Sequence, residues 1–136
     1  MKGLALLLFA GAAAALPAAA IDPYGGEGCR YEGKVGKDGL PEGKGIWSCQ
    51  NGNRYEGGFK HGKFDGRGKF TVTPQGGIYI ETLGSGSEKF RNMTFDGRFK
   101  NNRADGVHKV SENGEVLFVV TFRQGMIYDV KLPKKK

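Results

Sequence analysis

The chain has 136 residues, of which 24 are glycine, and its formal net charge is +7 at neutral pH. Hydrophobic residues make up 38% of it, and many of them stand in the first twenty positions. The remainder supports one small domain with a thin core, closer to one layer of sheet, which excludes the layered α/β domains that house many enzymes. So much glycine without a collagen-like period predicts many tight turns or close backbone contacts.

Residues 1–20 have the pattern of a secretory signal peptide. Lys2 gives a positive start, residues 4–16 are apolar and rich in Leu and Ala, and Pro17 breaks that run before three alanines. This pattern predicts cleavage after Ala20, which leaves a mature chain in a secreted or periplasmic setting. An uncleaved anchor is the alternative, but the apolar run is short for a bilayer span.

A short lead-in, residues 21–30, is followed by a repeated unit that opens on an aromatic residue. If Tyr55 is counted as position one, glycine stands at positions three, eight, twelve and fourteen, and phenylalanine at five and sixteen. The unit that starts at Phe95 follows the same spacing without gaps, with asparagine at position eight and His108 at position fourteen. The unit that starts at Tyr31 needs one inserted residue.

Two weaker copies complete the repeat region, which we assign to residues 31–125. A degenerate unit starts near Tyr79, and a partial one starts near Phe118. Residues 126–136 then read as a basic C-terminal tail, and we expect its last part, residues 132–136, to be frayed and solvated.

Within each unit the side chains alternate as in a β-strand. Tyr55, Gly57 and Phe59 share one face, and the polar residues between them share the other. No part of the mature chain has a sustained helical period. Each unit therefore reads as an antiparallel hairpin that must stack on its copies to bury its apolar face.

The two cysteines test the register of the first hairpin. If both strands send their large residues to one face, one allowed register pairs Tyr31 with Trp47 and puts Cys29 opposite Cys49. The next allowed register pairs Tyr31 with Cys49, so Cys29 lies on the diagonal, about 7–8 Å from Cys49. That distance is too far for a relaxed bridge. We predict a Cys29–Cys49 disulfide, with two unpaired thiols as the alternative.

These units resemble the MORN repeat (membrane occupation and recognition nexus). The likeness rests on the Tyr-x-Gly start, the aromatic residue two positions later and the spaced glycine return, which are clearest in the units that start at Tyr31, Tyr55 and Phe95. The Tyr79 unit departs from the pattern because Glu81 stands where glycine belongs. The resemblance implies an all-β fold, a single-layer curved sheet of stacked antiparallel β-hairpins. It also implies scaffolding, protein or peptide binding, or attachment to anionic membranes.

Two surfaces are candidates for such binding. The first is the aromatic face, where a single-layer sheet would leave one side of the rings partly open, so we predict a partner groove that uses Tyr31, Trp47, Tyr55 and Phe59. The alternatives are that these rings are only the core, or that a partner adds a strand to the sheet edge. The second is a basic face for anionic lipid headgroups or an acidic partner, formed by Lys60, Lys63, Arg67, Lys100 and Arg103. A solvated, solubilising face is the alternative there.

Asn92 opens a sequon and is a candidate glycosylation site in a eukaryotic host. Catalysis finds little support, because no acid or cysteine nucleophile is spaced with His61 or His108 as in a triad. The chain has no recognisable metal-ligand spacing, and we predict neither a catalytic residue, a metal site nor a cofactor.

The sequence thus predicts a non-catalytic binding or scaffold module with a protein or peptide partner. Peripheral association with an anionic membrane is the first alternative, and a small hydrolase is a second that no motif supports. Nucleic acid is a poorer partner, because the predicted signal peptide removes the chain from the cytosol. Exposed sheet edges also leave a homodimer open.

Overall fold

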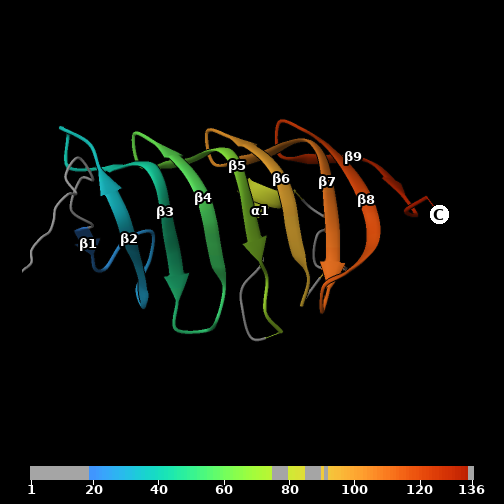
Figure 1. Cartoon of the computed structure of the whole chain (residues 1–136), viewed down its shortest axis with the longest axis horizontal. Helices are drawn as coiled ribbons and strands as arrows, with labels where there is room; N and C mark the ends of the chain where they lie inside the picture. Colours follow the sequence, from blue (N-terminus) through green and yellow to red (C-terminus); the bar gives the residue numbers. More distant parts are fainter. Residues whose placement is uncertain (1–18, 75–79, 85–89, 91, 135–136) are drawn as a thin grey trace, which may run out of the picture.

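The computed structural model describes residues 19–74, 80–84, 90 and 92–134. In these residues the chain forms one open antiparallel sheet of nine strands in sequence order, with β1 and β9 at opposite ends of an elongated molecule (Figure 1). The predicted all-β hairpin array is therefore confirmed. The strands are β1 (Ala19–Ile21), β2 (Cys29–Val35), β3 (Pro41–Cys49), β4 (Arg54–Lys60), β5 (Lys63–Thr71), β6 (Thr94–Lys100), β7 (Arg103–Glu112), β8 (Glu115–Arg123) and β9 (Met126–Lys131).

Two-residue turns close the β4–β5, β6–β7 and β8–β9 hairpins along one edge of the sheet, whereas residues 36–40 join β2 to β3. At the β4–β5 tip, His61 and Gly62 have φ values of 50° and 82°, and at the β6–β7 tip Asn101 and Asn102 have values of 50° and 72°. Positive φ at both central residues is the mark of a type I′ turn, whose twist matches that of the strands it joins. Asn102 takes the place of Gly62 because asparagine tolerates the left-handed region better than most residues.

Each tip docks onto the preceding unit through its own backbone. The N–H of Gly62 donates to the carbonyl of Pro41 at 2.9 Å, and the N–H of Asn102 donates to the carbonyl of Phe64 at the same distance. An acidic side chain accepts the neighbouring tip N–H: Glu42 from His61 at 3.2 Å, and Asp65 from Asn101 at 3.4 Å. The acid at position eleven of a unit therefore fastens the next unit.

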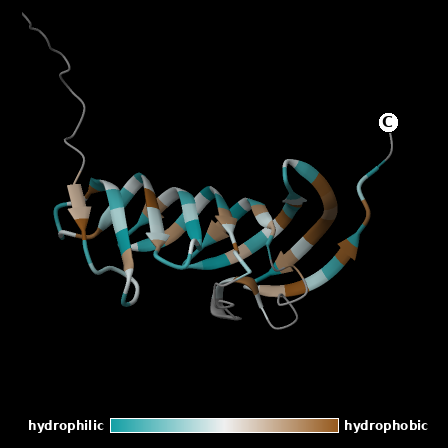
Figure 2. Ribbon diagram, turned by 90° about the horizontal axis from the view of Figure 1, so that it is seen from below, coloured by the Kyte–Doolittle hydropathy of each residue, from teal (hydrophilic) through white to brown (hydrophobic). Residues whose placement is uncertain are grey.

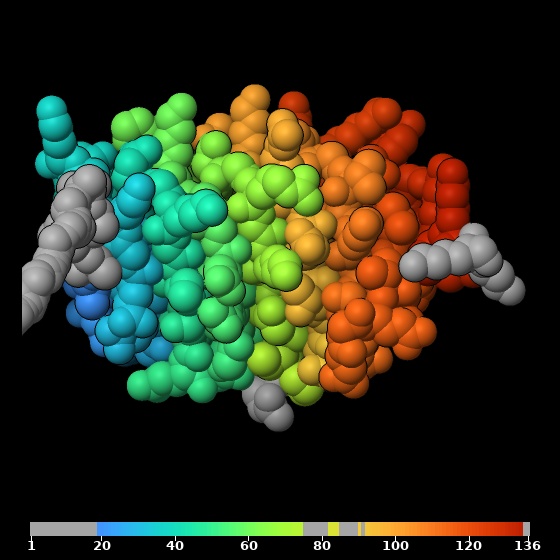
Figure 3. Space-filling view, viewed as in Figure 1, coloured from blue at the N-terminus to red at the C-terminus, as the bar shows by residue number. Residues whose placement is uncertain are grey.

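One face of the sheet carries the apolar core, and hydrophilic and hydrophobic residues alternate along the strands (Figure 2). Neighbouring units pack as successive bands along the long axis (Figure 3). The core is mostly aromatic, and its larger members are Tyr31, Trp47, Tyr55, Phe59, Phe64, Phe70, Phe90, Phe95, Phe99 and Phe122.

Five glycines form a row across this sheet. Gly33 pairs with Gly45, Gly45 with Gly57, Gly57 with Gly68, and Gly68 with Gly97. The rings of the tyrosines at position one lie over this row, so a Cβ on Gly68 would stand 2.5 Å from Cζ of Tyr55. Rings therefore shield bare strand backbone, as the spacing of glycine and aromatic residues predicts.

The predicted disulfide is confirmed. Cys29 lies directly opposite Cys49 in the β2–β3 ladder, beside the predicted Tyr31–Trp47 pair, and the two cysteines are joined. Cys29 is buried at the start of the first full hairpin.

Reducing this bridge should lower the stability of the fold without changing its architecture. The bridge joins residues 20 positions apart. The chain-entropy model gives about 3 kcal/mol for a loop of that length. The double variant Cys29→Ser, Cys49→Ser should lose about this amount in urea-induced unfolding measured by circular dichroism. A loss below about 1 kcal/mol would show that the hairpin stack alone fixes this end of the array.

The segment between β5 and β6 differs from the predicted degenerate unit. Tyr79 lies outside the described residues, and β5 pairs directly with β6. The described part of the segment holds one short helix, α1 (Ile80–Leu83), and it buries Leu83 and Phe90 in the core. The described part of the segment adds Leu83 and Phe90 to the core without adding a strand to the sheet.

The two ends of the chain also bear on the predicted boundaries. Residues 126–131 form β9, so the predicted tail is a strand over more than half its length. The signal peptide stays a prediction, because residues 1–18 lie outside the described part. The predicted cleavage after Ala20 falls within β1.

Candidate functional site

The four aromatic residues predicted to form a groove are closed off from solvent. Tyr31 and Tyr55 are 0% exposed, and Trp47 and Phe59 are each 3% exposed. The expectation that one side of these rings stays open is wrong, because neighbouring units and the lead-in close over them: the Trp47 indole N–H donates to the carbonyl of Tyr24 at 2.9 Å. A partner-binding role for the four rings is untested, and it would require the packed core to open.

Tyr55 shows how firmly such a ring is held. It stacks on Phe64 with a centroid separation of 4.0 Å, and it meets Phe59 and Phe99 edge-on at 5.2 and 5.1 Å. Its hydroxyl donates to the carbonyl of Gly58 at 2.9 Å. Burial raises the pKa of this hydroxyl well above its usual value, so Tyr55 remains a hydrogen-bond donor.

In the third hairpin unit, which starts at Phe95, His108 makes the same kinds of ring contact and hydrogen bond as Tyr55. That unit opens on Phe95, which has no hydroxyl, and it has His108 where Gly68 stands in the unit before. The imidazole meets Phe99 and Phe122 edge-on, each at 5.0 Å, as Tyr55 meets Phe59 and Phe99. Its Nε2–H donates to the carbonyl of Arg98 at 2.7 Å. Arg98 stands three positions after Phe95, as Gly58 stands three after Tyr55.

His108 is therefore a structural residue of the core. It is 0% exposed, and its Nδ1 is buried without a hydrogen-bond partner. Burial is the main cause that lowers the pKa of His108, so the ring is neutral near pH 7. With Nε2 protonated, Nδ1 carries a lone pair, which costs less to bury than an unpaired N–H.

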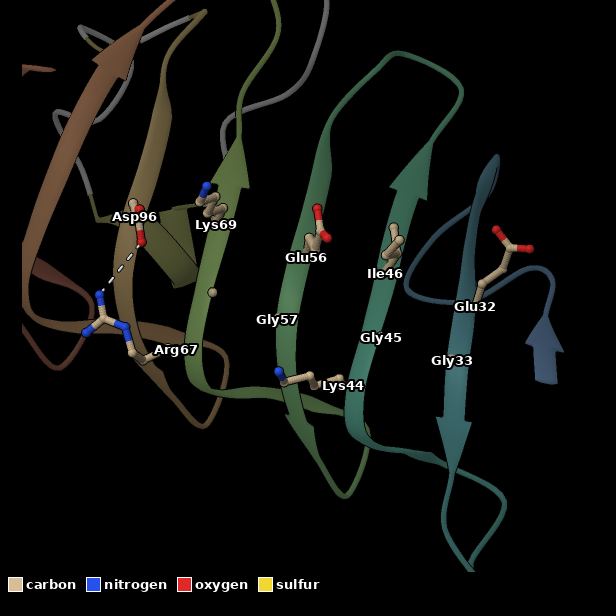
Figure 4. A pocket seen from close by; sticks show the side chains of 11 residues that line it. Glu32, Gly33, Lys44, Gly45, Ile46, Glu56, Gly57, Arg67, Lys69 and Asp96 are labelled. Atoms are coloured by element: carbon tan, nitrogen blue, oxygen red, sulfur yellow. Dashed lines mark ion pairs between the residues drawn. The ribbon is translucent and has the colours of Figure 1, made fainter. Parts of the chain in front are cut away.

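An open groove lies on the opposite, polar face of the sheet. Its floor is the backbone of Gly33, Gly45, Gly57 and Gly68, and its volume is about 630 Å³. One row of side chains runs along it from β2 to β6, with each member paired to the next across the ladder (Figure 4). This row is Glu32, Ile46, Glu56, Lys69 and Asp96.

Lys44 and Arg67 line the other side of the groove, beyond the glycine floor (Figure 4). The walls thus carry three acidic and three basic side chains, with the half-buried Ile46 as an apolar element. Arg67 and Asp96 lie 3.8 Å apart as an exposed ion pair. Such a pair contributes little to stability, so a ligand can displace it at small cost.

The predicted basic face divides into two places. Lys60 pairs with Lys63, and Lys100 with Arg103, so these four exposed cations flank the β4–β5 and β6–β7 tips. Arg67 is separate from them, because it lines the groove. The Glu42 and Asp65 carboxylates, which accept the tip N–H groups, stand near these cations and reduce the net positive charge there.

The candidate glycosylation site Asn92 is exposed, and so is His61, for which no catalytic role was predicted. Asn92 lies in a turn with φ of 68°, and its side-chain N–H donates to the Glu112 carboxylate at 3.4 Å, so its glycosylation stays a prediction. His61 Nδ1 lies 3.3 Å from a carboxylate oxygen of Asp38. In the part of the chain that the structure describes, no cluster of three His, Cys, Asp or Glu side chains is arranged to hold a metal ion.

A family model of the MORN repeat matches residues 31–54 and residues 55–71, which span β2 to β5. This chain is a MORN-repeat protein. MORN repeats generally bind proteins or membranes, and MORN-repeat proteins are generally non-catalytic scaffold modules. A search of curated proteins gives no significant match. No helix among the described residues of this MORN-repeat protein is both long and apolar enough to cross a membrane.

The MORN hairpins continue beyond the matched residues. β6 to β9 extend the same sheet with the same tip contact, since the N–H of Gly125 donates to the carbonyl of Ala104 at 2.9 Å. In the unit that starts at Phe95, phenylalanine replaces the tyrosine of position one and His108 replaces the glycine of position fourteen, while the packing of the core is kept. A sequence signal for His108 exists: the unit that has histidine in place of glycine at position fourteen also has phenylalanine in place of tyrosine at position one.

Proposed function

We propose that this MORN-repeat protein binds an extended segment of a partner protein in the glycine-floored groove. The observation that supports the proposal is the groove itself, an open channel of about 630 Å³ whose walls carry charged side chains from five neighbouring strands. The aromatic core on the other face makes the floor rigid. The aromatic rings therefore support the proposed site without touching the partner.

The dimensions favour a short stretch of chain. Strands β2 to β6 spaced about 4.8 Å apart span about 19 Å, which about six residues of extended chain cover. The groove runs across the strands, and its floor glycines pair with one another within the sheet, so we expect recognition to depend on side chains. Glu32 and Glu56 favour basic groups, Arg67 and Lys69 favour acidic groups, and Ile46 offers an apolar contact.

A peptide selection tests this proposal. The probe is a displayed library of random peptides on the oxidised full chain. We expect enriched peptides to combine a basic, an apolar and an acidic residue. Ile46→Lys should weaken their binding by about tenfold or more, because it places a charge on the apolar part of the wall.

Val107→Lys is the matched control. Val107 is 60% exposed on the same polar face, outside the groove, and it receives the same kind of substitution. Its variant should bind the peptides as the unmodified protein does. Failure to enrich any peptide, or equal binding by the Ile46→Lys variant, would contradict the proposal.

The four tip cations favour one second candidate, attachment to an anionic surface. Lys60, Lys63, Lys100 and Arg103 stand on neighbouring tips, where a flat lipid surface could meet them together. Binding to vesicles that contain phosphatidylglycerol should then fall steeply with salt and be lost in the Lys60→Glu, Lys100→Glu variant. Vesicle binding that resists salt, or that persists in this variant, would contradict this candidate.

We infer a secreted or periplasmic setting for this non-catalytic module. The Cys29–Cys49 disulfide supports it, because such bridges persist mainly in oxidising compartments. The N-terminal signal-peptide pattern is the second support. Sequencing the N-terminus of the mature protein from its host tests the predicted cleavage after Ala20, and Met1 at that terminus would contradict it.

A further inference from the structure

The outer edge of β9 is open. β9 ends the strand order and pairs with β8 on one side, and no strand of the described residues pairs with its other side. Its apolar side chains are also unusually exposed: Tyr128, Val130 and Leu132 are between 45% and 76% exposed. An open strand edge with exposed apolar residues is a template for another strand.

We propose that two copies of this chain pair edge to edge through β9, about a two-fold axis at Val130. A two-fold dimer uses the same patch on both copies, so the sequence of the patch must complement itself when it is read antiparallel. This requirement can be checked residue by residue.

A register centred on a residue keeps the polar faces of both sheets on the same side, because facing positions then differ by an even number. Tyr128 is the extra residue of a bulge, since Asp129 pairs with Thr121 and Ile127 with Phe122, so the regular part of β9 offers three such centres: Asp129, Val130 and Lys131. A centre at Asp129 sets two aspartates against each other, and a centre at Lys131 sets two lysines against each other. A centre at Val130 sets Asp129 of each copy opposite Lys131 of the other. Opposite charges stabilise a cross-strand pair and like charges destabilise it.

The flanking residues fit the same register. Val130 faces its own copy, and the bulge at Tyr128 ends the regular stretch on the other side of the Asp129–Lys131 pairs. The Arg123 guanidinium lies 3.5 Å from the Tyr128 ring centroid and holds this ring against β8. Pro133 has no N–H to donate and therefore ends the paired stretch after Leu132. The dimer would join two arrays into one continuous sheet, and it does not depend on a ligand in the groove.

Charge reversal at β9 tests the dimer on the oxidised full chain by sedimentation velocity. The unmodified protein should sediment as a dimer at high concentration. Asp129→Lys and Lys131→Asp should each raise the dissociation constant by roughly tenfold or more, since each places like charges opposite each other twice. The double variant Asp129→Lys, Lys131→Asp exchanges the charges and should dimerise as the unmodified protein does.

Three results would overturn the proposal: a monomer at every concentration, single variants that dimerise as well as the unmodified protein, or a double variant that fails to recover. Asp129 and Lys131 lie within 3.9 Å of each other on an exposed strand, so the variants should fold, and circular dichroism checks this. The Ile46→Lys variant should dimerise normally, which separates this test from that of the groove.

Discussion

Replacing His108 by glycine should destabilise the fold by about 3–5 kcal/mol, and adding Phe95→Tyr to that variant should recover at least half of the loss. The single substitution removes a fully buried ring that lies between Phe99 and Phe122, and it leaves the Arg98 carbonyl without its donor. Urea-induced unfolding of the two variants and the unmodified protein measures both effects.

The recovery follows from the geometry of the second unit. There, Tyr55 lies over Gly68 and donates to the carbonyl of Gly58. A tyrosine at position 95 over a glycine at position 108 reproduces this arrangement and returns a donor to Arg98. Phe95→Tyr alone should destabilise by about 1–3 kcal/mol, because the place of its hydroxyl is taken by the imidazole. Additive losses in the double variant would show that His108 does not stand in for a tyrosine.

The pH dependence of stability gives an independent readout of the same exchange. The pKa of buried His108 is lowered below its usual value near 6.5, so below that pH the unfolded chain binds a proton that the folded chain does not. The contribution of His108 to the free energy of unfolding is therefore full above about pH 6.5 and falls as the pH drops below it. The Phe95→Tyr, His108→Gly variant has no histidine at this position, so its stability should not show this fall at low pH.

Gly68→Ala should destabilise the fold by about 3 kcal/mol, at the upper end of the usual cost of overpacking. The new methyl group would stand 2.5 Å from Cζ of Tyr55, and this ring cannot retreat because it is stacked on Phe64. Gly45→Ala should act in the same way against Tyr31, since its Cβ would stand 2.6 Å from Cζ of that ring. Thermal unfolding by circular dichroism provides the measurement.

Gly66→Ala is the control for overpacking. Gly66 lies on the same strand as Gly68, and a Cβ there meets no atom within 4 Å. Its φ of +96° makes alanine costly by only about 1–2 kcal/mol. If Gly66→Ala destabilised the fold as much as Gly68→Ala, backbone strain and not ring packing would explain the glycine row.

The repeat spacing predicted the hairpins, the register of the first one and the disulfide because these depend on local rules. A period of two fixes which residues share a face, and the match of large residues across the first hairpin leaves one register that joins Cys29 to Cys49. The tips follow from residues such as Gly62 and Asn102 that accept positive φ. These features can be predicted from residues close together in the sequence, without knowing how the units pack.

The features that the sequence did not reveal depend on how the units pack. The spacing places Tyr31 and Tyr55 on one face, but only the stack and the lead-in decide that this face is closed. The sequence pattern did not indicate the groove, because its floor is glycine backbone and presents no side chain that could be recognised as a binding group. β9 falls within the predicted tail because a single strand without the glycine spacing of the repeat carries no local signal of its pairing with β8.

The most direct test of the groove as the partner site is a nitrogen-edited NMR titration of the oxidised full chain with a peptide from the selection. We expect the largest amide shifts on the floor and walls of the groove, at Gly45, Ile46, Gly57 and Gly68. Shifts concentrated at the tip residues Lys60 and Arg103, or along β9, with the groove amides unmoved, would contradict this expectation.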